Sequence, residues 1–301
     1  MHCLGVFFRN ASMYKVIYFF LKLSSYLPFW LLYMMSDALY LIVYKVFKYR
    51  IELVRHNLNN SFPEKSEAEK REIERKFYRH FTDMMVEAHK MMSISPKQML
   101  KRMRYVNYEP MLKHYDDERS VVMMTSHFGN WEWLSSFSLL LPKGKPVYQV
   151  YKKLSSTLSE QISFRVREQF GAVNVEMKEL LRKMVGLKKE DKLGMFGLIS
   201  DQSPEYTPHL HFMDFMHQPT AFILGGEQLA KKFNYPVYFA SIQCVKRGFY
   251  TCSFELITEN PTETSEYEIT EKYSKLLERD IRRQPEQWLW SHKRWKFQPG
   301  K

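Results

Sequence analysis

The sequence has little cysteine, and its three cysteines include no closely spaced pair of the kind that binds zinc or performs redox chemistry. An odd number without such a pair argues against a disulfide-stabilised secreted domain and against a structural zinc site. Cys244 and Cys252 flank an Arg-Gly turn signal and could face each other across a hairpin, but we expect both to be reduced packing residues. Internal repeats, low-complexity linkers and recognisable nucleic-acid motifs are also missing.

What the sequence does contain is basic charge and aromatic side chains. Of 301 residues, 45% are hydrophobic and 26% are charged, and the mean hydropathy is -0.42. These values exclude wholesale disorder and a polytopic membrane protein. A net charge of +12 and 16% aromatic residues are less ordinary. They favour a polyanion or a membrane surface as partner, because cations bind phosphates while Tyr and Trp prefer the membrane interface.

One N-terminal segment is apolar enough to interact with a membrane. Residues Leu23–Tyr44 carry Asp37 as their only charge, and about 20 residues suffice to cross a bilayer. Serines and Pro28 interrupt the run, however, and its aromatic residues are spread along its whole length. We therefore expect a helix that lies in the membrane interface, with a spanning helix and a buried aromatic hairpin as alternatives. This defines an N-terminal membrane-associating segment, residues 1–50, and a main domain, residues 51–301.

The sequence of the main domain predicts an α/β fold. Ser66 and Glu69 form a capping box before an amphipathic helix that we expect to have a charged outer face. Beyond residue 119, strands alternate with helices, which predicts a largely parallel central sheet flanked by helices. We expect strands at 120–126, 146–151, 172–175, 192–200, 236–245 and 249–257, and helices at 130–141, 156–170, 176–188 and 221–233. In such sheets, functional residues gather at the carboxyl ends of the strands.

His127 stands at one such strand end and is the main candidate for catalysis. A Gly-Asn turn follows it, and Glu132 lies at the start of the next predicted helix. We expect Glu132 to hold one imidazole nitrogen, which leaves the other as a general base for an alcohol. The His-x4-acid spacing is weak evidence, because His209 and Asp214 repeat it in a loop. A structural histidine that is merely satisfied by Glu132 is the alternative.

Several motifs, in a fixed order between about residue 50 and residue 297, resemble one family. Together they are similar to the late lipid A biosynthesis acyltransferases, the lauroyl/myristoyl transferase group of the lysophospholipid acyltransferase superfamily. Two positions depart from the pattern, Ser203 after the Asp-Gln pair and Phe222 before Gly225, and we expect such differences to affect the substrate more than the reaction. The motifs that carry the resemblance are His56–Glu64, Ser126–Glu132, Tyr151, Arg167–Gly171, Asp201–Gln202 and Pro285–Lys296.

The resemblance implies an enzyme that transfers a fatty acyl chain directly, without an acyl-enzyme intermediate. The donor would be a thioester of acyl carrier protein, with coenzyme A as the alternative carrier, and the acceptor a hydroxyl of a lipid A precursor. The reaction would take place at the cytoplasmic face of the bacterial inner membrane, without a metal or a further cofactor. His127 would be the general base and Glu132 its partner.

The same resemblance assigns substrate-binding roles to four further residues. Asn130, with backbone amides of its turn, would stabilise the oxyanion, Arg167 would bind a phosphate or orient the donor, and Asp201 and Gln202 would line the site.

Two other functions compete with this interpretation. One is an acyltransferase for another lipid acceptor, such as a lysophospholipid, an aminolipid or a glycolipid. The other is a basic nucleic-acid-binding or membrane-binding protein without catalysis, although we expect no nucleic-acid partner. The C-terminal cluster of Trp288, Trp290 and Trp295 is interpreted as packing beside a phosphate-tolerant surface. We expect Arg167, Lys293 and Arg294 to lie on the side of the domain that carries His127.

Overall fold

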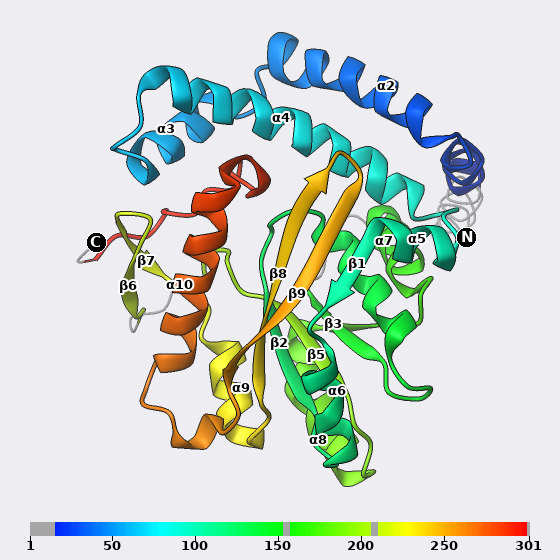
Figure 1. Ribbon diagram of the computed structural model, residues 1–301, viewed down its shortest axis with the longest axis vertical. Coiled ribbons are helices and arrows are strands. Elements are labelled where there is room, and N and C mark those ends of the chain that lie inside the picture. The colour runs from blue at the N-terminus through cyan, green and yellow to red at the C-terminus, as the bar shows by residue number, and fades with distance from the viewer. Residues whose placement is uncertain (1–15, 153–156, 206–209, 300–301) are drawn as a thin grey trace, which may run out of the picture.

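A seven-stranded sheet forms the centre of the molecule (Figure 1). The computed structural model describes residues 16–152, 157–205 and 210–299, so Cys3 and His209 lie outside it. The strand order is β1-β9-β8-β2-β5-β3-β4. The strands are β1 (Met103–Val106), β2 (Val121–Thr125), β3 (Val147–Tyr151), β4 (Val173–Glu176), β5 (Met195–Ile199), β8 (Val237–Lys246) and β9 (Phe249–Thr258).

The sheet is parallel except for one hairpin. β8 and β9 are antiparallel, and every other neighbouring pair runs in the same direction. All five residues of β2 are buried, as expected for a central strand that helices cover on both faces. The predicted α/β fold with a largely parallel sheet is confirmed.

Helices and two hydrophobic clusters cover the two faces of the sheet. A π-helical turn, Leu41–Val46, continues α2, and a 3-10 helix, Trp131–Leu140, occupies the place of the α-helix expected after His127. The helix Val16–Ser25 precedes α2. The labelled α-helices are α2 (Phe29–Tyr40), α3 (Ile51–Ser61), α4 (Glu67–Lys90), α5 (Pro96–Arg102), α6 (Glu109–Asp116), α7 (Thr157–Glu168), α8 (Leu180–Lys189), α9 (Gly225–Phe233) and α10 (Glu268–Arg283).

Two features of the sheet architecture were not predicted from the sequence. Strand β1 adds to the edge of the sheet beside β9. In the proline-containing loop, β6 (Phe212–Phe215) and β7 (Gln218–Ala221) pair as a separate hairpin. Its turn residues Met216 and His217 both have positive φ without being glycine, so the usual sequence signal of a tight turn is missing. Because β7 ends at Ala221, the helix expected from that residue begins only at Gly225.

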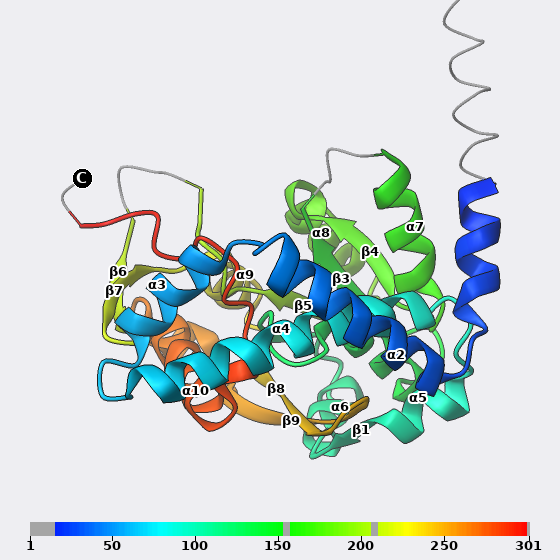
Figure 2. The same cartoon turned by 90° about the horizontal axis from the view of Figure 1, so that it is seen from above.

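Helix α4 lies between α2 and the sheet (Figure 1), and α2 packs across it (Figure 2). The predicted capping box is present at Ser66 and Glu69. The expected charged outer face is present in the first half of the helix and absent from the second half, where Asp83 and Glu87 are buried. The exposed charged residues of the first half are Glu67, Glu69, Arg71, Arg75, Lys76 and Arg79. Burial follows from the position of α4, because α2 covers the side that a surface helix would present to water.

The two described cysteines are free, as expected. They do not face each other across the β8–β9 hairpin, because Cys244 lies opposite Tyr250 and Cys252 lies opposite Ile242. A shift in register between Cys244 and Lys246 accompanies this arrangement. Burial raises the pKa of the Cys244 thiol to about 12, so both the pairing and the chemistry favour a packing role.

Candidate active site

The ends of two neighbouring parallel strands bring His127 and Asp201 together. Thr125, the last residue of β2, pairs with Ile199, the last residue of β5. The Ser200 amide then donates to the Thr125 carbonyl at 3.0 Å, which extends the pairing by one residue. His127 and Asp201 each stand two residues beyond their strand, at the edge of the sheet where α/β enzymes place their chemistry.

Asp201 holds the imidazole of His127. The His127 Nδ1 lies 2.7 Å from Asp201 Oδ1, and the His127 backbone amide donates to Oδ2 at 3.0 Å. The Trp288 indole donates to the same Oδ2 at 2.8 Å. Burial opposes ionisation of Asp201, but the charge of His127 and these hydrogen bonds outweigh it and lower the pKa of the carboxyl. An ionised carboxylate only accepts, so Nδ1 carries a proton, and in the neutral ring Nε2 keeps its lone pair.

The other ring nitrogen of His127 faces Gln202. The Gln202 Nε2 lies 3.1 Å from His127 Nε2, which suits an amide that donates to the free lone pair. The His127 side chain is 17% exposed, so the ring remains accessible at one edge. A substrate hydroxyl that reaches Nε2 must take the place of the Gln202 amide.

Glu132 does not have the position expected from the sequence. Its carboxylate accepts two hydrogen bonds from Arg167, at 2.8 Å from Nε and 2.6 Å from Nη2. Burial opposes ionisation of Glu132, yet the hydrogen bonds and charge of Arg167 and the charge of His127 lower its pKa. The prediction that Glu132 orients the imidazole is therefore wrong in geometry. The reason is that β5 already places Asp201 at Nδ1, while α7 presents Arg167 to the start of the 3-10 helix.

Asn130 also serves a different purpose from the one expected. Its side chain is fully buried, the Nδ2 donates to Glu87 Oε2 at 2.6 Å, and the Oδ1 accepts from the Trp133 amide at 3.2 Å. The Gly129 amide donates to the Gln287 carbonyl at 3.0 Å. Two of the donors proposed for an oxyanion, the Asn130 side chain and the Gly129 amide, are thus engaged in holding the turn itself. The sequence placed Asn130 beside His127 correctly but could not supply its partner, which is 43 residues away.

The C-terminal aromatic block takes a larger part in the site than packing alone. Trp288 donates to Asp201, and the Leu289 amide donates to the His127 carbonyl at 3.1 Å. Arg294 is buried, contrary to the expected basic surface, and its guanidinium lies 4.5 Å from the Phe222 ring centroid. Burial lowers its pKa to about 10, against the opposing effect of the Asp201 charge.

Of the three basic residues expected on the His127 side, Arg167 and Arg294 take part in defined contacts. Arg167 is 24% exposed and paired with Glu132, and Arg294 is near Asp201 but enclosed. Within the ranges that the structure describes, no group of three or more His, Cys, Asp or Glu side chains could hold a metal ion. The chemistry of the site is that of a histidine with a buried carboxylate, which suits removal of a proton from a hydroxyl.

Comparison with known proteins decides the family. The family model of the bacterial lipid A biosynthesis acyltransferases matches residues 8–297 of the sequence. This chain belongs to that family. It is therefore an acyltransferase, and its family acts in lipid A biosynthesis. No curated protein matches the chain.

The match to the lipid A biosynthesis acyltransferases covers nearly the whole structure. The match includes α2, the central sheet and the C-terminal Trp288 block. A lipid acceptor and an acyl donor follow from the family. The resemblance found in the sequence motifs is thereby confirmed at the level of the family.

Proposed function

We propose that this acyltransferase moves a fatty acyl chain from a thioester, of acyl carrier protein or of coenzyme A, to a hydroxyl of a lipid A precursor. The observation that carries the proposal is the His127–Asp201 pair, in which an ionised carboxylate fixes the proton on Nδ1. A histidine held in this tautomer is a general base at Nε2. Glu132 contributes a second negative charge near the ring.

The proposed reaction is a direct transfer. Nε2 of His127 removes the proton from the acceptor hydroxyl as the oxygen attacks the thioester carbonyl. The carbon–sulfur bond of the tetrahedral intermediate then breaks, and the departing sulfur takes the proton from the imidazolium. The products are an ester on the lipid and a free thiol on the carrier. A positioned base of this kind accelerates a reaction by about 10²–10⁴-fold.

The test is transfer of a radiolabelled acyl chain by the purified protein to a lipid A precursor. Parallel reactions use the acyl carrier protein thioester and the coenzyme A thioester, which decides the donor. His127→Ala should abolish transfer, and His56→Ala, which changes an exposed histidine of α3, should not. Unchanged turnover by folded His127→Ala would overturn the mechanism. Mass spectrometry of lipid A from cells with and without the gene should reveal the loss of one acyl chain.

We also propose that the enzyme lies on the cytoplasmic face of the inner membrane with α2 in the interface. The segment Phe29–Val46 is long and apolar enough to cross a bilayer, and only 22% of it is buried. Its outward side chains include Trp30, Met34 and Leu41, which are 64%, 59% and 54% exposed. An apolar surface of this kind is typical of membrane contact.

The inward face of the same segment argues against a spanning helix. Ser36 donates to Asp83 at 2.6 Å, and Tyr44 donates to Glu74 at 2.8 Å. Arg247, from the turn between β8 and β9, bridges Asp37 and Asp83 at 2.7 and 2.6 Å. Insertion across the bilayer would break these contacts or carry the acidic residues of α4 into hydrocarbon, where charged groups are costly.

Vesicle flotation tests this orientation. The protein should float with vesicles that contain anionic lipid, and Trp30→Ser combined with Met34→Ser should weaken binding. Leu181→Ser on α8, where the leucine is also partly exposed, is the matched control and should bind normally. Alkaline carbonate should release an interfacial protein. Retention of the protein in carbonate-washed membranes would contradict the interfacial placement.

A further inference from the structure

Helix α4 contacts the catalytic turn from one face. His80 Nε2 lies 3.3 Å from the Gly129 carbonyl oxygen, and Glu87 Oε2 accepts from Asn130 at 2.6 Å. The backbone carbonyl of Glu87 also accepts from the Trp133 indole at 3.1 Å. His80 and Glu87 are seven residues apart, which is two helical turns, so they lie on the same side of α4.

The turn that α4 holds has little freedom of its own. Gly129 has φ +59°, and a Cβ at this position would lie 2.7 Å from Ile242 Cγ2, so only glycine fits. His127 precedes this glycine by two residues. A displacement of the Gly129–Asn130 segment would therefore move the imidazole relative to Asp201.

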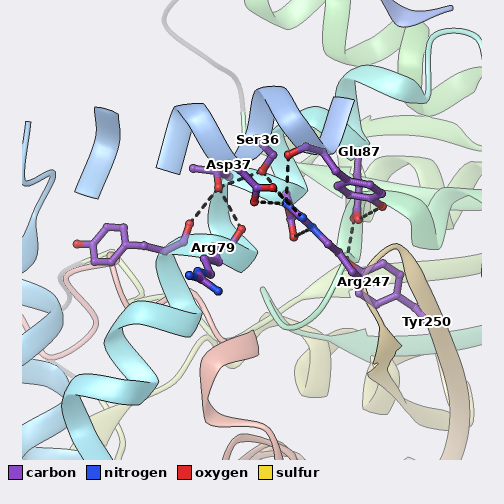
Figure 3. A network of polar contacts seen from close by, with 10 residues as sticks. Ser36, Asp37, Arg79, Glu87, Arg247 and Tyr250 are labelled. Atoms are coloured by element: carbon purple, nitrogen blue, oxygen red, sulfur yellow. Dashed lines mark hydrogen bonds and ion pairs between the residues drawn. The ribbon is translucent and has the colours of Figure 1, made fainter. Parts of the chain in front are cut away.

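Glu87 also joins this turn to the N-terminal helix. Its Oε1 accepts from the Tyr33 hydroxyl of α2 at 2.8 Å, and its Oε2 accepts from Tyr250 of β9 at 2.8 Å. The carboxylate is buried, with 1% of the residue exposed. Figure 3 displays Glu87 and Tyr250 in this polar network between α2, α4 and the β8–β9 hairpin. One side chain thus contacts both the proposed membrane-binding helix and the catalytic turn.

We propose that His80 and Glu87 are positioning residues, which hold the turn that carries His127 and which couple it to docking of α2 through Tyr33. The inference rests on the proposed function, because the consequence for catalysis requires His127 to be the base. Neither residue touches the reacting atoms. Each acts through the Gly129–Asn130 segment, and α2 acts through Glu87.

Substitutions at Glu87 separate hydrogen bonding from volume. In Glu87→Gln, the carboxamide oxygen can still accept from Asn130 and Tyr250, and the Tyr33 hydroxyl can rotate to accept from the new amide group. In Glu87→Leu, the side chain has similar bulk but accepts nothing, so the buried Asn130 amide loses its partner. We expect Glu87→Leu to lower kcat 10- to 100-fold with little change in KM, and Glu87→Gln to restore it to within about threefold of wild type.

The α2 side of the coupling has a matched control in Ser36. Tyr33 and Ser36 both anchor α2 to α4 by buried or partly buried hydrogen bonds, but Ser36 contacts Thr82 and Asp83 rather than Glu87. Tyr33→Phe should lower kcat about three- to tenfold without a change in KM. Ser36→Ala should leave kcat unchanged. Equal losses of kcat in the two variants would overturn the coupling, since α2 would then act only by its packing.

Amide hydrogen exchange provides a readout that does not require activity. The peptide that covers residues 125–133 should exchange at least tenfold faster in Glu87→Leu and His80→Phe, and at the wild-type rate in Ser36→Ala and Glu87→Gln. Faster exchange would support the positioning role even if no acyl transfer to a lipid A precursor were detected, in which case only the proposed function would fail. Unchanged exchange in Glu87→Leu would overturn the inference. If Glu87→Leu does not fold, His80→Phe and Tyr33→Phe decide it.

Discussion

Replacement of Asp201 by asparagine is the sharpest test of the catalytic geometry. Asp201 accepts one hydrogen bond at Oδ1, from His127 Nδ1, and two at Oδ2, from the His127 amide and the Trp288 indole. A carboxamide has one oxygen and one NH₂ group in place of these two oxygens. The variant therefore cannot satisfy all three donors.

The balance of these contacts predicts how the introduced carboxamide is oriented. With its oxygen at the Oδ2 position, it keeps the two donors that cannot change, the His127 amide and the Trp288 indole. Its NH₂ group then faces Nδ1, which can adapt by giving up its proton. The opposite orientation leaves two N–H groups facing an NH₂ group in a buried site, where each unmade hydrogen bond costs about 1–3 kcal/mol. The first orientation should dominate.

In this orientation of the carboxamide, His127 can no longer act as a general base at Nε2. With Nδ1 unprotonated, the proton of the neutral ring lies on Nε2, which can no longer accept one from the acceptor hydroxyl. The same change of tautomer in a serine-protease triad lowers kcat about 10⁴-fold, and we expect roughly 10³–10⁴-fold here. KM should change little, because the variant alters the ring proton and not the binding surface.

The assay is single-turnover transfer from a labelled thioester, together with a thermal melt to verify folding. Glu132→Gln is the comparison variant, because it also neutralises a carboxylate near His127 but leaves Nδ1 in contact with Asp201. Its loss of kcat should be smaller, since it removes charge without changing the tautomer. Retention of more than a tenth of wild-type kcat by Asp201→Asn, or a larger loss in Glu132→Gln, would refute the assignment of Asp201 as the orienting residue.

Three further predictions concern charges in and around the site. Arg167→Ala leaves the Glu132 carboxylate without its bidentate partner and should lower the free energy of unfolding by about 3 kcal/mol. In denaturant titrations, the double variant Arg167→Ala/Glu132→Gln should recover most of this loss, and equal stability of the single and double variants would contradict the pairing. Burial lowers the pKa of His80 to about 4, below its unfolded value near 6.5, so the unfolded state binds a proton first as the pH falls. The wild type therefore loses stability between pH 6.5 and pH 4, by roughly 3 kcal/mol in total. Because burial also lowers the pKa of His292 to about 4, both proteins lose stability in this window, but thermal melts should show a steeper loss in the wild type than in His80→Gln; parallel pH curves would argue against the assignment to His80. Burial raises the pKa of Glu87 to about 7, and the negative charge of Asp83 also raises it. The hydrogen bonds from Tyr33, Tyr250 and Asn130 lower this pKa, and the Arg102 guanidinium on α5 also interacts with the Glu87 charge. The stabilising contribution of this group is complete below pH 4.5 and is lost as the pH rises through 7, so the stability of the wild type relative to Glu87→Gln should fall over this window, and a constant difference would contradict the burial of the carboxylate.

The fold was predictable because its signals are local. The buried strand Val121–Thr125 is a continuous apolar run, and the capping box at Ser66 and Glu69 depends on two residues three positions apart. The β6–β7 hairpin lacks such a signal, because its turn contains Met216 and His217 at positive φ. Its pairing also gains stability from neighbours that are distant in sequence, which the chain pattern does not reveal.

His127 could be singled out from the sequence as the candidate base, but the residue that holds its imidazole could not. His127 and Glu132 lie in one short motif, so proximity along the chain favoured their pairing. Asp201 is 74 residues away, and its position at Nδ1 depends on the strand order, in which β5 is the neighbour of β2. Asp201 was expected to line the site, but only this adjacency selects it over Glu132 as the partner of Nδ1. The missing information was topological rather than chemical.

The polar residues of α4 illustrate a deeper limit and a functional reason for it. A helix with Glu74, His80, Asp83 and Glu87 resembles a solvated surface helix, and packing these groups inside carries a desolvation cost that an apolar helix would avoid. Each accepts or donates a specific hydrogen bond, and those of His80 and Glu87 reach the catalytic turn. An apolar interface would hold α2 against the sheet with at least equal stability, but it would not specify the direction of the Gly129 carbonyl or of the Asn130 amide. The polar side chains of α4 therefore serve to orient the turn, whose geometry sets the position of His127. The stability that their burial costs would have no function in a helix that only packs.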